Sequence, residues 1–195
     1  LKWDDADYTN VEIAFKVSYA IGLLLAGRFI DTVGTKKGYA WATGLWSVAA
    51  VLHAAAKSVF GFSVARAALG VTEAGNFPAA IKTVAEWFPR KERAFATGLF
   101  NSGANIGAII APLTVPFIAA AYGWQWAFIA TGLLGFIWLF FWNKHYYKPS
   151  EHPKLSPAEL AYINSDADAI AEGDALNTKS FSWVALLKYK QTWVE

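Results

Sequence analysis

The chain has 195 residues, of which 55% are hydrophobic, 16% aromatic and 16% charged, and its formal net charge is +2. This composition is too apolar for a typical soluble domain and favours a protein that lies mostly in a membrane, with no nucleic acid among its partners. The absence of cysteine excludes disulfides, thiol catalysis and cysteine-ligated metals, and we expect no cofactor. Because the chain starts at Leu1, contains no methionine and stops abruptly at Glu195, we interpret it as a fragment.

Five apolar segments follow one another, each close to the roughly 17–25 residues that a membrane-spanning helix needs. They cover residues 11–30, 39–56, 60–84, 94–121 and 124–142. The sequence therefore predicts an all-α membrane protein. Residues 1–10 are expected to form an external loop, and residues 144–195 a cytoplasmic stretch that leads to a further helix.

The positive charges orient these segments, because cytoplasmic loops are enriched in Lys and Arg. Nine Lys and Arg residues flank the links after the first, third and fifth segments, against three on the opposite side. The nine are Arg28, Lys36, Lys37, Lys82, Arg90, Lys91, Arg93, Lys144 and Lys148, and the three are Lys2, Lys16 and Lys57. The first helix is thus predicted to run inward.

A short surface helix is expected in the cytoplasmic stretch. Ser156 is suited to the N-cap, Pro157 to the first helical position and Glu159 to the third, which together form a capping box. Gly173 is a plausible end, and residues 181–189 form a second amphipathic piece.

Two charged residues lie in the third apolar segment. Arg66 and Glu73 are seven residues apart, so they share one face of a helix at roughly 10 Å along its axis. Charges within membrane segments are functional candidates by default. A guanidinium matches a carboxylate, and a carboxyl group can carry a proton. The alternative is a structural Arg66–Glu73 ion pair or network that holds helices together.

The link after the first helix resembles the signature loop of the major facilitator superfamily. It contains Gly27, Asp31, Gly34, Lys36 and Lys37. Thr32 and Thr35 depart from the signature, which usually has basic residues there. The resemblance implies that the five helices are helices two to six of a twelve-helix transporter, in its N-terminal half, followed by the central cytoplasmic loop.

Four stretches resemble the anion:cation symporter family, and among its members the hexuronate transporters. They cover residues 66–78, 86–93, 100–103 and 124–129. The resemblance implies a multi-pass inner-membrane carrier that imports a hexuronate, galacturonate or glucuronate, by proton symport and alternating access, and we expect a monomer. A carrier of galactonate or glucarate, or a membrane sensor that binds without transport, stays as an alternative.

Within that resemblance, Arg66 binds the substrate carboxylate and Glu73 couples to protons. Tyr19 matches a tyrosine that faces the cavity, although a packed or interfacial tyrosine is an alternative. Asn101 and Asn105 lie one turn apart and are expected to present amides to substrate hydroxyls, unless they join helices instead.

The remaining polar and small residues favour packing. His53 is expected to be packed, and no spacing ties it to Ser102 as a protease pair, so an enzyme is not predicted. Gly70 with Ala74, and Gly103 with Gly107, form small-xxx-small pairs that are typical of close helix contacts.

Overall fold

The computed structural model describes residues 3–165, and in this range the chain forms helices, short 3-10 turns and loops, without strands. The α-helices are α1 (Asp5–Val33), α2 (Thr35–Leu52), α3 (Val59–Glu73), α4 (Asn76–Trp87), α5 (Arg90–Tyr122), α6 (Trp124–His145) and α7 (Pro157–Ile163). Two 3-10 turns are η1 (His53–Ala55) and η2 (Pro149–Glu151). The predicted all-α fold is confirmed.

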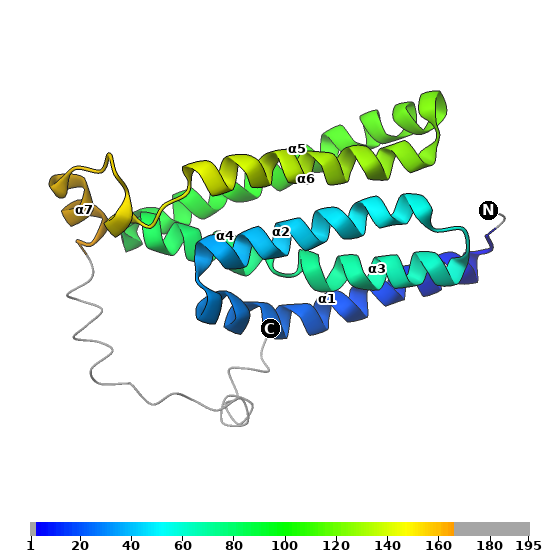
Figure 1. The fold of residues 1–195 in the computed structure, drawn as a ribbon, viewed down its shortest axis with the longest axis horizontal. Coiled ribbons are helices and arrows are strands. Elements are labelled where there is room, and N and C mark those ends of the chain that lie inside the picture. The colour runs from blue at the N-terminus through cyan, green and yellow to red at the C-terminus, as the bar shows by residue number, and fades with distance from the viewer. Residues whose placement is uncertain (1–2, 166–195) are drawn as a thin grey trace, which may run out of the picture.

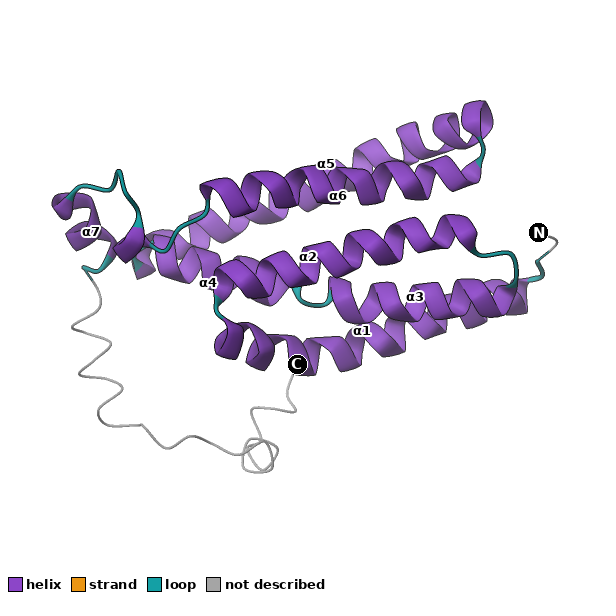
Figure 2. Cartoon of the chain, in the orientation of Figure 1, coloured by secondary structure: helices purple, strands orange, loops and turns teal. Residues whose placement is uncertain are grey.

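The long helices lie side by side along the longest axis of the molecule (Figure 1). α1 packs along α3, α2 packs on α6 and on α3, and α5 packs on α6. Figure 2 shows short connections at both ends, and α7 lies beyond the end at which α1, α4 and α6 finish. Side chains that approach one another across α1, α2 and α3 therefore form the centre of the described structure.

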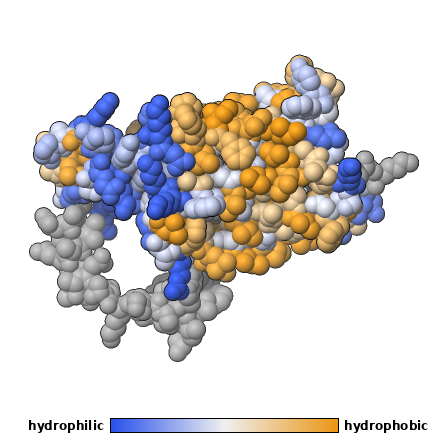
Figure 3. All heavy atoms as spheres, viewed as in Figure 1, coloured by the Kyte–Doolittle hydropathy of each residue, from blue (hydrophilic) through white to orange (hydrophobic). Residues whose placement is uncertain are grey.

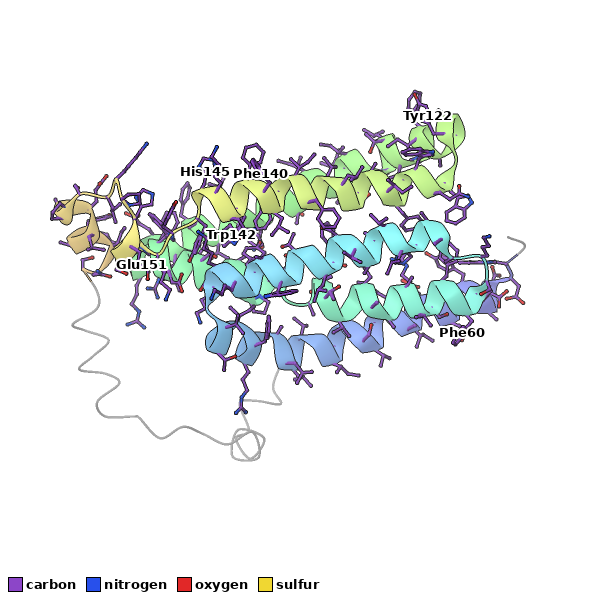
Figure 4. The ribbon with its side chains drawn as sticks, in the orientation of Figure 1. Phe60, Tyr122, Phe140, Trp142, His145 and Glu151 are labelled. Carbon is purple, nitrogen blue, oxygen red and sulfur yellow. The ribbon has the colours of Figure 1, made fainter. Side chains whose placement is uncertain are left out.

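Among the helices of residues 3–165, three are individually long and apolar enough to cross a membrane, namely α1, α5 and α6. On the face shown in Figure 3, apolar residues cover the middle of the molecule as a belt, while hydrophilic residues gather at the α7 end. Phe140 and Tyr122 are 63% and 70% exposed and point away from the neighbouring helices (Figure 4). Apolar side chains exposed in this way suit a hydrocarbon environment.

The first helix begins earlier than the sequence predicts. We expected an external loop through residue 10, but α1 starts at Asp5. The Asp4 carboxylate accepts a hydrogen bond from the Asp7 backbone N–H at 2.7 Å, and Asp7 reciprocates, which forms a capping box. This local cap satisfies orphan N–H groups and so extends the helix beyond its apolar part.

The third apolar segment, predicted over residues 60–84, is divided between α3 and α4. Ala74 and Gly75 separate the two helices, which follow one another in Figure 1. Pro78 is the third residue of α4. A proline is tolerated there because the first four N–H groups of a helix have no intrahelical partner.

Small residues bring α1 and α3 close together. A Cβ atom at Gly70 would lie 2.6 Å from the Phe15 carbonyl oxygen and 3.0 Å from the Tyr19 nitrogen, and Ala74 is fully buried. The small-xxx-small pair of Gly70 and Ala74 is therefore confirmed as a helix contact. Gly103 and Gly107 have no such neighbour within 4 Å in the described part of the chain.

The expected capping box of the cytoplasmic stretch is confirmed. The Ser156 side chain accepts from the Glu159 backbone N–H at 3.2 Å, and the Glu159 carboxylate accepts from the Ser156 backbone N–H at 2.9 Å. The helix ends at Ile163, before Gly173. The expected end at Gly173 and the piece over 181–189 lie outside the described residues.

Candidate functional site

Arg66 lies on α3 and faces the N-terminal half of α1. Its guanidinium carbon is 5.9 Å from the centre of the Phe15 ring. Beside it is a cavity of about 200 Å³ lined by Tyr8, Val11, Glu12, Phe15, Lys16 and Arg66. The guanidinium thus has an aromatic surface on one side and a polar opening on the other, which leaves its N–H fork available to an anion.

Tyr19 reaches the same aromatic ring from the next turn of α1. The rings of Phe15 and Tyr19 stack with their centres 5.7 Å apart. Arg66 and Tyr19, which the sequence analysis proposed separately, therefore contact Phe15 from two helices. Phe15 was missed, although its position four residues before Tyr19 places both on one face of a helix.

Glu73 is the last residue of α3 and is half-buried. The Arg66 charge acts on its carboxyl group, and the polar side-chain group of Trp46 on α2 acts on it as well. Lys16–Glu12 and Lys82–Asp31 form ion pairs within 4 Å in the described structure, whereas Arg66 and Glu73 do not pair with one another. The two charges are close enough to influence one another and far enough apart to bind different partners.

Asn101 and Asn105 lie on α5, where both side chains are exposed. Phe100, which precedes Asn101, contacts the Phe77 ring on α4 at 6.4 Å between ring centres. The described structure therefore does not bring the two asparagines to Arg66 and Tyr19.

The signature-loop residues lie at the α7 end of the bundle. Gly34 separates α1 from α2 with φ of 87°, a left-handed conformation that favours glycine. The Lys82 ammonium on α4 lies 2.6 Å from the Asp31 carboxylate and 3.4 Å from the Ile30 carbonyl oxygen. A Cβ atom placed on Gly27 would have no heavy atom within 4 Å in the described part of the chain. No neighbouring helix therefore packs closely against Gly27 there.

The two lysines of this loop have different surroundings. The Lys36 ammonium lies 4.5 Å from the centre of the Tyr147 ring, and the Lys36 carbonyl accepts a hydrogen bond from the Trp142 indole at 3.0 Å. Figure 4 shows Trp142 at the end of α6, beside the start of α2. Lys37 is exposed and lines a groove with Trp41. The loop is thus attached to the end of α6 as well as to α4.

Glu86 completes this attachment and was missed as a structural residue. Its carboxylate accepts a hydrogen bond from Thr35 at 2.5 Å and another from the Tyr146 hydroxyl. Burial of Tyr146, together with the adjacent Glu86 carboxylate, raises the pKa of the Tyr146 phenol. One carboxylate thereby joins the start of α2, the end of α4 and the residue that follows α6. In the sequence, the available indication of this contact was Thr35, which occupies a position where the signature loop usually has a basic residue.

His53 is packed, as expected. It is fully buried, its Nδ1 lies 2.7 Å from the Ala49 carbonyl oxygen, and its ring stacks on Phe128 at 4.8 Å. Because a carbonyl only accepts, Nδ1 carries the proton, and Nε2 has no partner among the described residues. No group of three or more His, Asp or Glu residues that could hold a metal occurs within residues 3–165.

Comparisons with known proteins give the family. The model of the Major Facilitator Superfamily matches residues 1–194. The chain is 39% identical, over 95% of its length, to a galacturonate transporter of Dickeya chrysanthemi and covers 53% of that protein. It is 38% identical, over 95% of its length, to a hexuronate transporter of Escherichia coli strain K12 and covers 43% of it.

A third relative is a D-galactonate transporter of Escherichia coli O6:H1, with 37% identity over 87% of this chain and 39% of that protein. The chain spans about half the length of these curated relatives. The family model nevertheless matches almost every residue, and the structure supplies the helices and apolar belt of a membrane protein. The chain belongs to the Major Facilitator Superfamily.

Proposed function

We propose that this chain is part of a secondary active transporter that imports a hexuronate by proton symport. Membership of a transporter family agrees with the prediction that the protein is not an enzyme. The substrate class is supported by the galacturonate and hexuronate transporters among its relatives. The observation that carries the proposal is that Arg66 and Glu73 lie on one helix, α3, without pairing with one another.

Arg66 binds the carboxylate of the sugar acid. A planar guanidinium offers two parallel N–H donors to a carboxylate, and the neighbouring cavity gives an anion access to them. Tyr19, stacked on the same Phe15 ring, supplies a hydroxyl for the sugar. Asn101 and Asn105 join the site if α5 approaches α1 in the intact carrier, and their exposed side chains are consistent with this role.

Glu73 carries the coupled proton. A bound sugar-acid carboxylate neutralises Arg66 and so removes the positive charge that favours the ionised form of Glu73. Substrate binding and protonation then support one another, and the neutral site can cross the low-dielectric barrier as the two halves rock. In this mechanism the five predicted spans are helices two to six of the N-terminal half of a monomeric inner-membrane protein. Residues 144–195 are the cytoplasmic loop between halves.

A counterflow screen tests the substrate. Proteoliposomes that contain the complete gene product are loaded with galacturonate, glucuronate, galactonate or glucarate, and exchange of labelled galacturonate is measured. The proposal expects galacturonate and glucuronate to support the fastest exchange. Faster exchange with galactonate or glucarate would favour the alternative of a related sugar-acid carrier.

Two variants test the mechanism. Arg66→Ala should reduce both exchange and uptake, because the carboxylate loses its cation. Glu73→Gln should abolish accumulation driven by an imposed pH gradient while leaving exchange, since only the proton step is removed. Normal pH-driven accumulation by Glu73→Gln would refute the coupling role. Binding without any uptake by the wild-type protein would instead favour a sensor.

A further inference from the structure

The cavity beside Arg66 contains a second cation that the mechanism above does not use. Lys16 and Glu12 both line this cavity, and the Lys16 ammonium lies 3.2 Å from the Glu12 carboxylate. They are four residues apart on α1, which is the spacing that brings side chains together on one helix face. Tyr19 follows Glu12 by seven residues, so this pair shares a face with the proposed sugar-binding tyrosine.

The charged side chains that line this cavity have a positive sum, which favours an anionic ligand. Arg66 and Lys16 each supply one positive charge and Glu12 supplies one negative charge, while the other lining residues, Tyr8, Val11 and Phe15, are uncharged at neutral pH. The cavity therefore presents a net charge of +1 to a ligand. A hexuronate carries one carboxylate, whereas a sugar diacid carries two.

We infer that the Glu12–Lys16 pair makes the site selective for sugar acids with one carboxylate over sugar acids with two. This inference rests on the proposed function and extends it to residues that the sequence analysis did not assign. Lys16 is held by Glu12, so Arg66 alone is free to pair with an anion. A second carboxylate has no free cation and meets the Glu12 carboxylate instead.

The exposure of the pair suits this role. The side chains of Lys16 and Glu12 are 68% and 48% exposed, so the pair contributes little to the stability of the fold. Removing one charge should therefore change ligand preference without unfolding the protein. An interaction of one extra charge over several ångströms in a partly hydrated site corresponds to roughly threefold to tenfold in affinity.

The test measures competition by two ligands that differ by one carboxylate. Proteoliposomes with the complete gene product exchange labelled galacturonate, and the half-inhibitory concentrations of glucuronate and galactarate are determined. In the wild type, galactarate should be the weaker competitor. Glu12→Gln frees Lys16. It should lower the half-inhibitory concentration of galactarate, relative to that of glucuronate, by roughly threefold to tenfold. Lys16→Gln should raise it.

Two control variants make the result decisive. The double variant Glu12→Gln with Lys16→Gln restores a net charge of +1 and should return the ratio to the wild-type value. Asp5→Asn removes a negative charge from the same end of α1 outside the cavity and should leave the ratio unchanged. The inference is overturned if Glu12→Gln leaves the ratio unchanged, if the double variant keeps the shift, or if Asp5→Asn produces the same shift.

The proposed function can fail separately. If the wild-type protein exchanges no sugar acid, the proposed function fails and this inference fails with it. If the wild type exchanges galacturonate and the ratio does not respond to Glu12→Gln, the charge inference alone is wrong.

Discussion

The contact between α1 and α3 at Gly70 predicts a large effect of a single methyl group. In Gly70→Ala, the new Cβ atom would lie 2.6 Å from the Phe15 carbonyl oxygen and 3.0 Å from the Tyr19 nitrogen. Ordinary van der Waals contact begins near 3.4 Å, so α1 must move away by about 0.8 Å. These two atoms belong to the backbone, so no side-chain rotation can relieve their clash, and the Ser18 hydroxyl on α1 is a further, closer obstruction.

The expected cost follows from overpacking. Forcing an extra carbon atom into a close-packed contact typically costs about 1–3 kcal/mol. For a chain of this size, that corresponds to a fall in Tm of roughly 2–12 °C. The movement also displaces Phe15, on which Arg66 and Tyr19 both lie, so the KM for a sugar acid should rise as well.

The matched control is Gly98→Ala on α5. Gly98 is also helical, and no heavy atom lies within 4 Å of its Cβ position in the described structure. Both substitutions gain the same intrinsic helix propensity, about 0.5–1 kcal/mol, so the difference between them isolates the packing cost. Tm is measured by loss of the monodisperse peak in detergent after heating. A Tm for Gly70→Ala equal to or above that of Gly98→Ala would refute the reasoning.

Three further predictions concern the α7 end of the molecule. Burial and the Glu86 carboxylate raise the pKa of the Tyr146 phenol in the folded protein. The hydrogen bond from Tyr146 to Glu86 therefore stabilises the fold fully below the usual tyrosine pKa near 10. This stabilisation is lost as the pH rises through the higher pKa of the folded state. The Tm difference between wild type and Tyr146→Phe should thus stay constant from pH 7 to about 10. The bonds from Ser156 lower the pKa of Glu159, so the capping box should weaken as pH falls below about 4, and Glu159→Gln should speed amide exchange at Ser156 under neutral conditions. Asp31→Asn removes an exposed partner of a lysine and should cost no more than about 1 kcal/mol by thermal unfolding; a larger loss would show that this ion pair stabilises more than a surface pair.

The sequence predicted the helices better than it predicted their ends. Apolar runs of spanning length and the Ser156 capping signal depend on local chemistry, and the structure has helices in each of those places. The early start at Asp5 was missed because polar residues were assigned to a loop although Asp4 and Asp7 can cap one another. The division between α3 and α4 was missed because hydropathy is continuous across Gly75, while Pro78 carried the available signal.

The candidate site was predictable only where one helix contains both partners. The spacing of Arg66 and Glu73 follows from helix geometry, and so does the spacing of Glu12 and Lys16. The second pair was given no role from the sequence because both charges lie near the N-terminal end of the first apolar segment. Contacts between helices cannot be obtained from periodicity. Phe15 under Arg66 and Trp46 beside Glu73 depend on how α1 and α2 pack on α3.

That packing also explains why the two charges of α3 can have separate tasks. Arg66 faces α1, where Phe15 and the cavity make it accessible to an anion, whereas the side chain of Trp46 on α2 acts on the Glu73 carboxyl group. A direct salt bridge would have fixed both charges and opposed protonation of Glu73 whether or not substrate was bound. Separation along the helix leaves the Arg66 charge as the link between them, so an anion that neutralises Arg66 changes the proton affinity of Glu73 without touching it. In the proposed mechanism, coupling between substrate and proton needs only the electrostatics of one rigid helix, which the close contact at Gly70 holds against α1.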